Sequence, residues 1–217
     1  MKILPTTFAD KMRLFCLTLV LICVSYVCNA QVLYYYSTYA PREGDIVFQS
    51  LPHNDLVDAI EGVTRSPYSH CGVVLLDANG HWVVIESIVD VHETPLLRWM
   101  IRGRKAGIAV YRLDDKYRSV IPEFKKHLLF DLGKPYDYDY EMSEKAIYCS
   151  ELPYKAFLKT TGEPLGKLQK LGDLNWKPYE AFIRTVQGNK LPLDREMITP
   201  DGLSKAVQLK EVFRKGI

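Results

Sequence analysis

The sequence predicts an α+β fold in a single domain, and three features support this prediction. Apolar residues recur at helical spacing in segments 55–64 and 117–132. Segments 68–76 and 82–89 are rich in β-branched and apolar residues, and residues 78–80 between them (Ala-Asn-Gly) are typical of a hairpin turn. The chain has 217 residues, which suits one domain with a core of its own.

The first 30 residues are expected to be a secretory signal peptide. Three basic residues precede the apolar run 14–27, and residues 28–30 (Cys-Asn-Ala) supply small side chains before a cleavage point. The run is shorter than the roughly 20 apolar residues of a membrane span, so cleavage is favoured over an uncleaved anchor. We therefore expect residues 31–217 to be exported to the periplasm or cell envelope, with no stable membrane span.

The remaining elements are justified by local signals along the chain. A first strand is expected at 44–48, entered through a turn and followed by the helix 55–64. Thr94 is expected to cap a short helix that begins at Pro95 and runs to Arg102. The other expected elements up to residue 161 are a strand at 107–113, a helix at 117–132 ended by Gly133, and a helix from about 149 to 161. Residues 162–178 are expected to be mostly loop, followed by a helix at 179–186 and an amphipathic segment at 202–214 opened by residues 199–201.

Charge gives little indication of a partner. The whole chain carries a formal net charge of +2, and the first 30 residues hold three basic residues against one acidic residue, which leaves the domain near neutrality. The basic residues at 102–105 form only a short mixed patch, so nucleic-acid binding is not expected. No CxxC pair occurs, and nothing in the sequence calls for a metal or an organic cofactor.

Cys149 carries the clearest chemical signal. Pro153 lacks a backbone donor and is tolerated only in the first turn of a helix, which places Cys149 at or just before the helix N-terminus. Free N–H groups and the positive end of the helix dipole favour a thiolate there and can stabilise an oxyanion. A buried structural thiol is one alternative, and a disulfide with Cys71, expected in the core, is another.

His70 is the candidate base. Strand alternation places His70 and Gly72 on one face and Cys71 on the other. Gly72 leaves room beside His70 for a second group, and a histidine satisfied within the core is the alternative. Three other histidines lie in loop or helix contexts where solvated roles are expected: His53, His81 and His127.

Glu86 is the candidate group that orients His70, and the choice depends on the hairpin register. A two-residue turn would put Glu86 on the face opposite to His70. A three-residue loop instead places Glu86 opposite Gly72 and on the same face as His70. An acidic residue inside an otherwise apolar strand needs a partner, because an unpaired buried carboxylate is costly. The alternative orienting residues are Asp90 and His92.

Five motifs together resemble the permuted papain-like amidases of the YiiX-like group, which are relatives of the NlpC-type cell-wall peptidases. They are GDIVF (44–48), YSHCGVV (68–74), VVIES (83–87), GKPYDYDY (133–140) and YCSEL (148–152). In ordinary papain-like enzymes the cysteine helix precedes the histidine strand, and here that order is reversed. The resemblance implies a circularly permuted papain-like (NlpC-type) fold, with a small antiparallel sheet or partial barrel packed against helices.

The resemblance also implies roles for individual residues. Cys149 corresponds to the nucleophile, His70 to the general base and acid, and Glu86 to the residue that orients His70. Tyr136, in GKPYDYDY, is the candidate substrate-binding residue, either as part of the groove wall or as a hydrogen-bond donor. The alternative for this segment is a tyrosine-rich loop that supports the cysteine helix.

The leading functional hypothesis is an exported cysteine hydrolase that cleaves amides of the cell envelope, such as peptidoglycan peptides, through an acyl-enzyme. The first alternative is a lipid-directed acyltransferase or acyl hydrolase on the same fold, with residues 34–36, Trp99 and Tyr136 lining an apolar groove. The second is a non-catalytic binding module, which the chemically competent residues argue against. Region 162–217 is expected to cover the core and to shape one wall of the cleft.

Overall fold

The computed structural model describes Cys16 and residues 38–217. Apart from Cys16, the predicted signal peptide lies outside the described residues, as do residues 34–36. The chain divides into residues 1–40 and a compact unit of residues 41–217, which holds every candidate site residue. Within the described part of the chain, no helix combines the length and the apolar character that a bilayer crossing requires.

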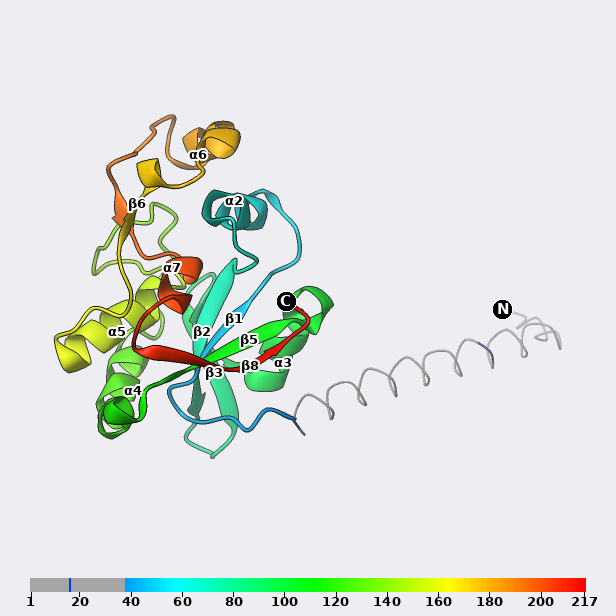
Figure 1. The fold of residues 1–217 in the computed structure, drawn as a ribbon, viewed down its shortest axis with the longest axis vertical. Helices are drawn as coiled ribbons and strands as arrows, with labels where there is room; N and C mark the ends of the chain where they lie inside the picture. The colour runs from blue at the N-terminus through cyan, green and yellow to red at the C-terminus, as the bar shows by residue number, and fades with distance from the viewer. Residues whose placement is uncertain (1–15, 17–37) are drawn as a thin grey trace, which may run out of the picture. The chain divides into compact units, whose positions relative to one another are not determined.

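A six-stranded antiparallel sheet forms the centre of the compact unit (Figure 1). Its strand order is β4-β3-β2-β1-β5-β8, and every neighbouring pair is antiparallel. The strands are β1 (Ile46–Gln49), β2 (His70–Leu76), β3 (Trp82–Ser87), β4 (Val91–Pro95), β5 (Ile108–Leu113) and β8 (Leu209–Lys215). A separate two-stranded sheet pairs β6 (Gln169–Lys170) with β7 (Glu196–Met197).

Some helices pack against the sheet, and others lie beyond one end of it. The helices are α2 (Asp55–Thr64), α3 (Leu96–Arg102), α4 (Ile121–Phe130), α5 (Glu151–Thr161), α6 (Glu180–Val186) and α7 (Pro200–Ser204). Helices α4 and α5 pack against each other, and α2 and α6 lie together beyond one end of the sheet (Figure 1). This arrangement confirms the expected α+β class, with an antiparallel sheet packed against helices.

The core lies between the sheet and the helices α4 and α5. Phe48 and Ile85 from the sheet are fully buried in the same cluster as Phe124 of α4 and Phe157 of α5. Burial of such apolar surface is the main favourable contribution to folding. Cys71 belongs to this cluster, as its strand position predicts.

The hairpin between β2 and β3 has the three-residue loop on which the prediction for Glu86 depends. Gly80 has a positive φ of 80°, and the Asp77 N–H donates to the His81 carbonyl. Val73 pairs with Ile85, so the same register places position 86 opposite position 72. The three-residue loop and its register are confirmed. Glycine suits the loop because it adopts this left-handed conformation without steric cost.

Three sequence predictions are wrong, two of them because the segments pair as strands. Thr94 does not cap a helix: it lies in β4, a strand that was not predicted and that pairs with β3, and α3 begins only after Pro95. The helix expected at 117–132 is divided into a 3₁₀ turn at 115–120 and α4, with Pro122 in the first turn of α4. The segment 202–214 contains α7 and then β8, which is a strand because it pairs with β5.

Candidate active site

His70 and Glu86 form a buried hydrogen-bonded pair across the β2–β3 hairpin. His70 Nε2 donates to Glu86 Oε2 at 2.5 Å, and the two side chains are 3% and 0% exposed. Gly72 allows this approach, since a Cβ at this position would lie 2.4 Å from Val84 Cγ1 and 3.3 Å from Glu86 Cβ. The predicted room beside His70 is therefore filled by the strand that carries Glu86.

The Glu86 carboxylate accepts hydrogen bonds from four side chains. Besides His70, the donors are Thr94 Oγ1 at 2.6 Å, Trp99 Nε1 at 3.0 Å and Arg102, which donates from Nη1 at 2.9 Å and from Nη2 at 2.5 Å. Burial favours the neutral acid, but the hydrogen bonds and charges of His70 and Arg102 outweigh burial and hold the pKa of Glu86 well below its usual range. Glu86 is thus an anion at neutral pH.

Cys149 lies two residues before α5, in the position that Pro153 predicts. Ser150 is the N-cap residue, so Pro153 occupies the first turn of the helix. Cys149 is 2% exposed. An anionic sulfur at this point lies at the positive end of the helix dipole, which stabilises a thiolate.

The groups around Cys149 favour a thiolate–imidazolium pair. The neighbouring Cys71, followed by His70, holds the pKa of Cys149 well below its ordinary range against the opposing effect of burial. Burial would lower the pKa of His70, but its interactions with Cys149 and Glu86 raise it to about 9. Since Nε2 of His70 is bound by Glu86, Nδ1 is the ring nitrogen that remains for Cys149. Such a pair can attack a carbonyl and return a proton.

Cys71 and Cys149 are both free thiols in this structure. The folded protein therefore has no disulfide between Cys71 and Cys149, which was one alternative from the sequence. Neither thiol is exposed to solvent, with relative exposures of 0% and 2%. Strand alternation assigns Cys71 to the core and does not predict that it neighbours Cys149.

Tyr136, in the tyrosine-rich loop 133–140, is another neighbour of Cys149. Tyr136 is buried, its hydroxyl lies 3.3 Å from that of Tyr140, and burial together with Tyr140 and Cys149 raises the pKa of Tyr136 well above its ordinary range. A protonated hydroxyl beside Cys149 can donate a hydrogen bond. Tyr136 does not line the apolar groove beside Cys149, so the prediction that it forms part of the groove wall is wrong. Tyr140 lines the groove in its place.

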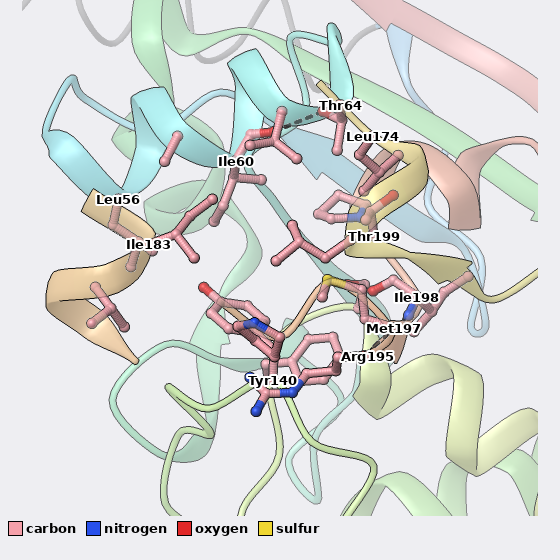
Figure 2. Close-up of a pocket in the computed structure, with 18 of the residues that line it drawn as sticks. Leu56, Ile60, Thr64, Tyr140, Leu174, Ile183, Arg195, Met197, Ile198 and Thr199 are labelled. Carbon is pink, nitrogen blue, oxygen red and sulfur yellow. Dashed lines mark hydrogen bonds between the residues drawn. The ribbon is translucent and has the colours of Figure 1, made fainter. Parts of the chain in front are cut away.

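An apolar groove is lined in part by Cys149. It encloses about 750 Å³ including its open mouth. Figure 2 shows Ile60 on one side of the groove and Tyr140 on the other. The region 171–200 forms one wall, as expected, whereas Trp99 is buried against Glu86 and does not line the groove. The main apolar residues of the groove are Leu56, Ile60 and Val63 of α2 and Phe182, Ile183 and Val186 of α6.

The alternative orienting residues do not reach His70. His92 Nδ1 lies 2.7 Å from Asp90 Oδ1, and His92 Nε2 lies 3.8 Å from the Glu86 oxygen that does not face His70. Three further histidines lie away from the site, with side chains 68%, 77% and 30% exposed: His53, His81 and His127.

A protein family described as permuted papain-like amidase enzymes, YaeF/YiiX, C92 family, matches residues 40–213. The chain belongs to this family. The uncharacterized protein YiiX of Escherichia coli strain K12 is 30% identical over 182 residues, which cover 81% of this chain and 87% of YiiX. Family membership supports a function of the cysteine hydrolase type, as expected for an amidase family.

The fold of a solved relative agrees with this assignment. The crystal structure of metalloprotein YiiX from Escherichia coli O157:H7 has a TM-score of 0.76 and 29% identity, and the match covers 82% of this chain and 99% of that one. The expected permuted papain-like fold is confirmed. Among the described residues, no three His, Cys, Asp or Glu side chains gather as metal ligands, so the site does not fit the metal that this relative's name implies.

Proposed function

We propose that the protein is an exported cysteine hydrolase that cleaves amide bonds through a Cys149–His70–Glu86 triad and an acyl-enzyme. The observation that carries the proposal is the buried His70–Glu86 pair, 2.5 Å apart, beside a cysteine whose pKa is held low. This is the arrangement that activates a nucleophile and fixes its base. The export part of the proposal rests on the sequence of residues 1–30.

In the first half of the reaction, the Cys149 thiolate attacks the amide carbonyl and the carbonyl oxygen becomes an oxyanion. Backbone N–H groups at the start of α5 and the Tyr136 hydroxyl are suited to stabilise that charge. The His70 imidazolium then gives its proton to the departing nitrogen, so the amine leaves neutral and a thioester remains on Cys149.

In the second half, neutral His70 takes a proton from water, and the hydroxide attacks the thioester carbonyl. The carbon–sulfur bond breaks, the acid departs and the thiolate–imidazolium pair is restored. Glu86 stays anionic throughout, because four donor side chains hold it. Its part is to fix the ring of His70 and to stabilise the imidazolium.

Two substrate classes are candidates, and each has its own line of support. Analogy with NlpC-type cell-wall peptidases suggests peptidoglycan peptides, and this is an argument from fold relatives alone. The groove favours a second candidate, an acyl hydrolase or acyltransferase that acts on lipid-like substrates. Its wall beside Cys149 is built from aliphatic and aromatic side chains of α2 and α6, and an apolar wall binds an acyl chain better than a charged peptide.

The triad is tested by trapping the acyl-enzyme. The purified protein is mixed with p-nitrophenyl acetate, and the intact mass and the labelled residue are determined by mass spectrometry. We expect one acetyl group on Cys149 in the wild type, none in Cys149→Ala, and slower acylation in His70→Ala. His127→Ala is the matched control, because this half-buried histidine lies on α4 away from the groove. Equal acylation in all four proteins would contradict the triad.

The substrate class is tested by varying the acyl chain. Rates of acylation by acetyl and decanoyl p-nitrophenyl esters are compared in the wild type and in Ile183→Asp, which puts a charge into the groove wall. Preference for decanoyl that is lost in Ile183→Asp would support the lipid-directed candidate. Equal rates with both esters, together with hydrolysis of peptidoglycan peptides, would support the amidase on peptide substrates.

A further inference from the structure

Arg195 is the one charged residue among the described residues that line the apolar groove beside Cys149. It lies between α6 and β7, and Figure 2 shows it with Tyr140 on the side of the groove that faces Ile60. The helices α2 and α6 contribute mainly aliphatic and aromatic side chains to the same groove. The groove therefore combines apolar walls with a single positive charge.

The backbone and one end of the Arg195 side chain are fixed by hydrogen bonds. The Arg195 carbonyl accepts from the Leu171 N–H at 3.1 Å, which extends the pairing of β6 with β7 by one residue. Nη1 of Arg195 donates to the Asp139 carbonyl and to Gln187 Oε1. Both acceptors are neutral, so these bonds hold the guanidinium in place and do not neutralise its positive charge.

Glu141 compensates the charge of Arg195 only weakly. Its Oε1 lies 3.4 Å from Nη2 of Arg195, which is longer than an ordinary hydrogen bond. The Glu141 side chain is 61% exposed, and an ion pair with such an exposed partner contributes little because water screens it. The Arg195 side chain is only 19% exposed, and a cation largely removed from water needs a partner. The position is therefore suited to an anionic group of a ligand.

We propose that the substrate is an amphiphile, with an apolar acyl chain that lies against α2 and α6 and an anionic group, carboxylate or phosphate, that pairs with Arg195. The inference rests on the proposed function, because it names the substrate class of the same site. A guanidinium binds either anion through two parallel N–H donors. Arg195 is thus a specificity-determining residue that transfers no proton, and the substrate anion displaces Glu141 from Nη2.

The charge of the groove distinguishes this substrate from simpler ones. No Asp or Glu is among the described residues that line the groove, so a cationic group would meet Arg195 without a compensating carboxylate. A neutral acyl chain would fill the apolar part and leave the guanidinium unpaired. A substrate that carries both a chain and an anion satisfies both parts of the groove.

The test compares two amides of similar shape that differ in charge. N-decanoylglycine carries a carboxylate, and N-decanoylglycinamide is its neutral counterpart. Their binding to the purified Cys149→Ala protein is measured by isothermal titration calorimetry, so that neither amide is hydrolysed. A partly exposed charge-assisted hydrogen bond corresponds to roughly tenfold in affinity, so we expect the acid to bind about tenfold more tightly. N-acetylglycine, which lacks the long chain, is expected to bind more weakly than N-decanoylglycine.

The preference for the acid should depend on Arg195. In Arg195→Gln the two amides should bind equally, and Arg195→Lys should keep part of the preference, since it retains the charge without the fork. Glu141→Gln removes the competing carboxylate and should increase the preference by up to about fivefold. Arg184→Gln is the matched control, because this arginine lies on α6, pairs with Glu180 and does not line the groove. Circular dichroism checks the fold of each variant.

The source of the anion is distinguished by a second pair of ligands. N-decanoyl-O-phosphoethanolamine carries a phosphate, and N-decanoylethanolamine is its neutral counterpart. A larger anionic preference in the carboxylate pair would identify an acylated amino acid or peptide as the substrate. A larger preference in the phosphate pair would identify a phosphate headgroup.

The outcomes separate this inference from the proposed function. Equal binding of the acid and the amide, or a preference that is unchanged in Arg195→Gln, would overturn the inference, and acylation of Cys149 by p-nitrophenyl acetate would still support the triad. A preference for the acid in a protein that neither cleaves the amides nor becomes acylated would instead contradict the proposed function. If Arg195→Gln does not fold, an unchanged preference in Glu141→Gln overturns the inference.

Discussion

His70 donates from Nε2 to Glu86 Oε2 at 2.5 Å, and neither side chain is more than 3% exposed. Because this hydrogen bond is buried, it holds the imidazole ring of His70 in one orientation and keeps a proton on Nε2. The pair is held by the hairpin that brings β3 beside β2, where a Cβ at position 72 would collide with Val84 and Ile85.

Glu86→Gln keeps the shape of the side chain and removes its charge. The imidazolium of His70 loses the stabilising carboxylate, so its pKa falls and the thiolate–imidazolium pair is weaker. We expect the rate of Cys149 acylation at pH 7 to fall by roughly 10²- to 10⁴-fold, the usual contribution of a positioned acid or base. Glu86→Asp retains the charge and is expected to be less affected. Wild-type rates in Glu86→Gln would contradict the orienting role.

The same substitution changes how stability depends on pH. The folded pKa of Glu86 lies below its ordinary value of 4.5, so the carboxylate contributes stability above pH 4.5 that is lost as pH falls toward the folded value. The difference in unfolding free energy between wild type and Glu86→Gln should therefore narrow below pH 4.5. Urea titrations at pH 7, 4 and 3 measure this difference. A constant difference across that range would show that Glu86 has an ordinary pKa in the folded state.

Arg102→Met removes the guanidinium that donates twice to Glu86. We expect a loss of about 1–3 kcal/mol of stability, because a buried acceptor loses charged donors while three other side chains still donate to it. The side chain of Arg102 is 27% exposed, which places the loss toward the lower part of that range. Arg118→Met, at an exposed position, is the control and should change stability little. The free energies of unfolding of both variants are measured by urea titration at pH 7.

Gly72→Ala tests the closeness of the hairpin strands. The added methyl group would lie 2.4 Å from Val84 Cγ1 and 2.8 Å from the Ile85 carbonyl oxygen, so β3 must move. We expect a destabilisation of about 1–3 kcal/mol from overpacking. Because β3 carries Glu86, the pH midpoint of Cys149 alkylation should also rise. An unchanged melting temperature together with an unchanged midpoint would show that the hairpin tolerates the side chain without displacing Glu86.

Much of the site could be predicted from short-range rules. Pro153 placed Cys149 just before a helix, and the glycine-closed loop fixed the register that puts Glu86 beside His70. These inferences need only the chemistry of proline, a turn and the alternation of a strand. Helix α2 was also predicted with its observed bounds, from the helical spacing of its apolar residues. In the structure Asn54 caps it and accepts a hydrogen bond from the Val57 N–H.

The missed features depend on contacts between distant segments. Arg102 reaches Glu86 only because β4 pairs with β3 and turns the chain into α3, and nothing local in 91–95 indicates that strand. The apolar residues of α2 and α6 have the spacing of core residues, although they line a groove. Cys71 was assigned to the core, which is correct for its burial but does not show that α5 begins beside it.

The most direct test of the account is the pH dependence of Cys149 alkylation in the purified protein, compared with His70→Ala and with His127→Ala as the control. We expect the wild type and the control to react well below the ordinary cysteine pKa of about 8.5, and His70→Ala to lose this reactivity. The wild-type reactivity should also change near pH 9, where His70 loses its proton. A Cys149 that is inert below pH 8.5, or that reacts equally with and without His70, would contradict the thiolate–imidazolium pair.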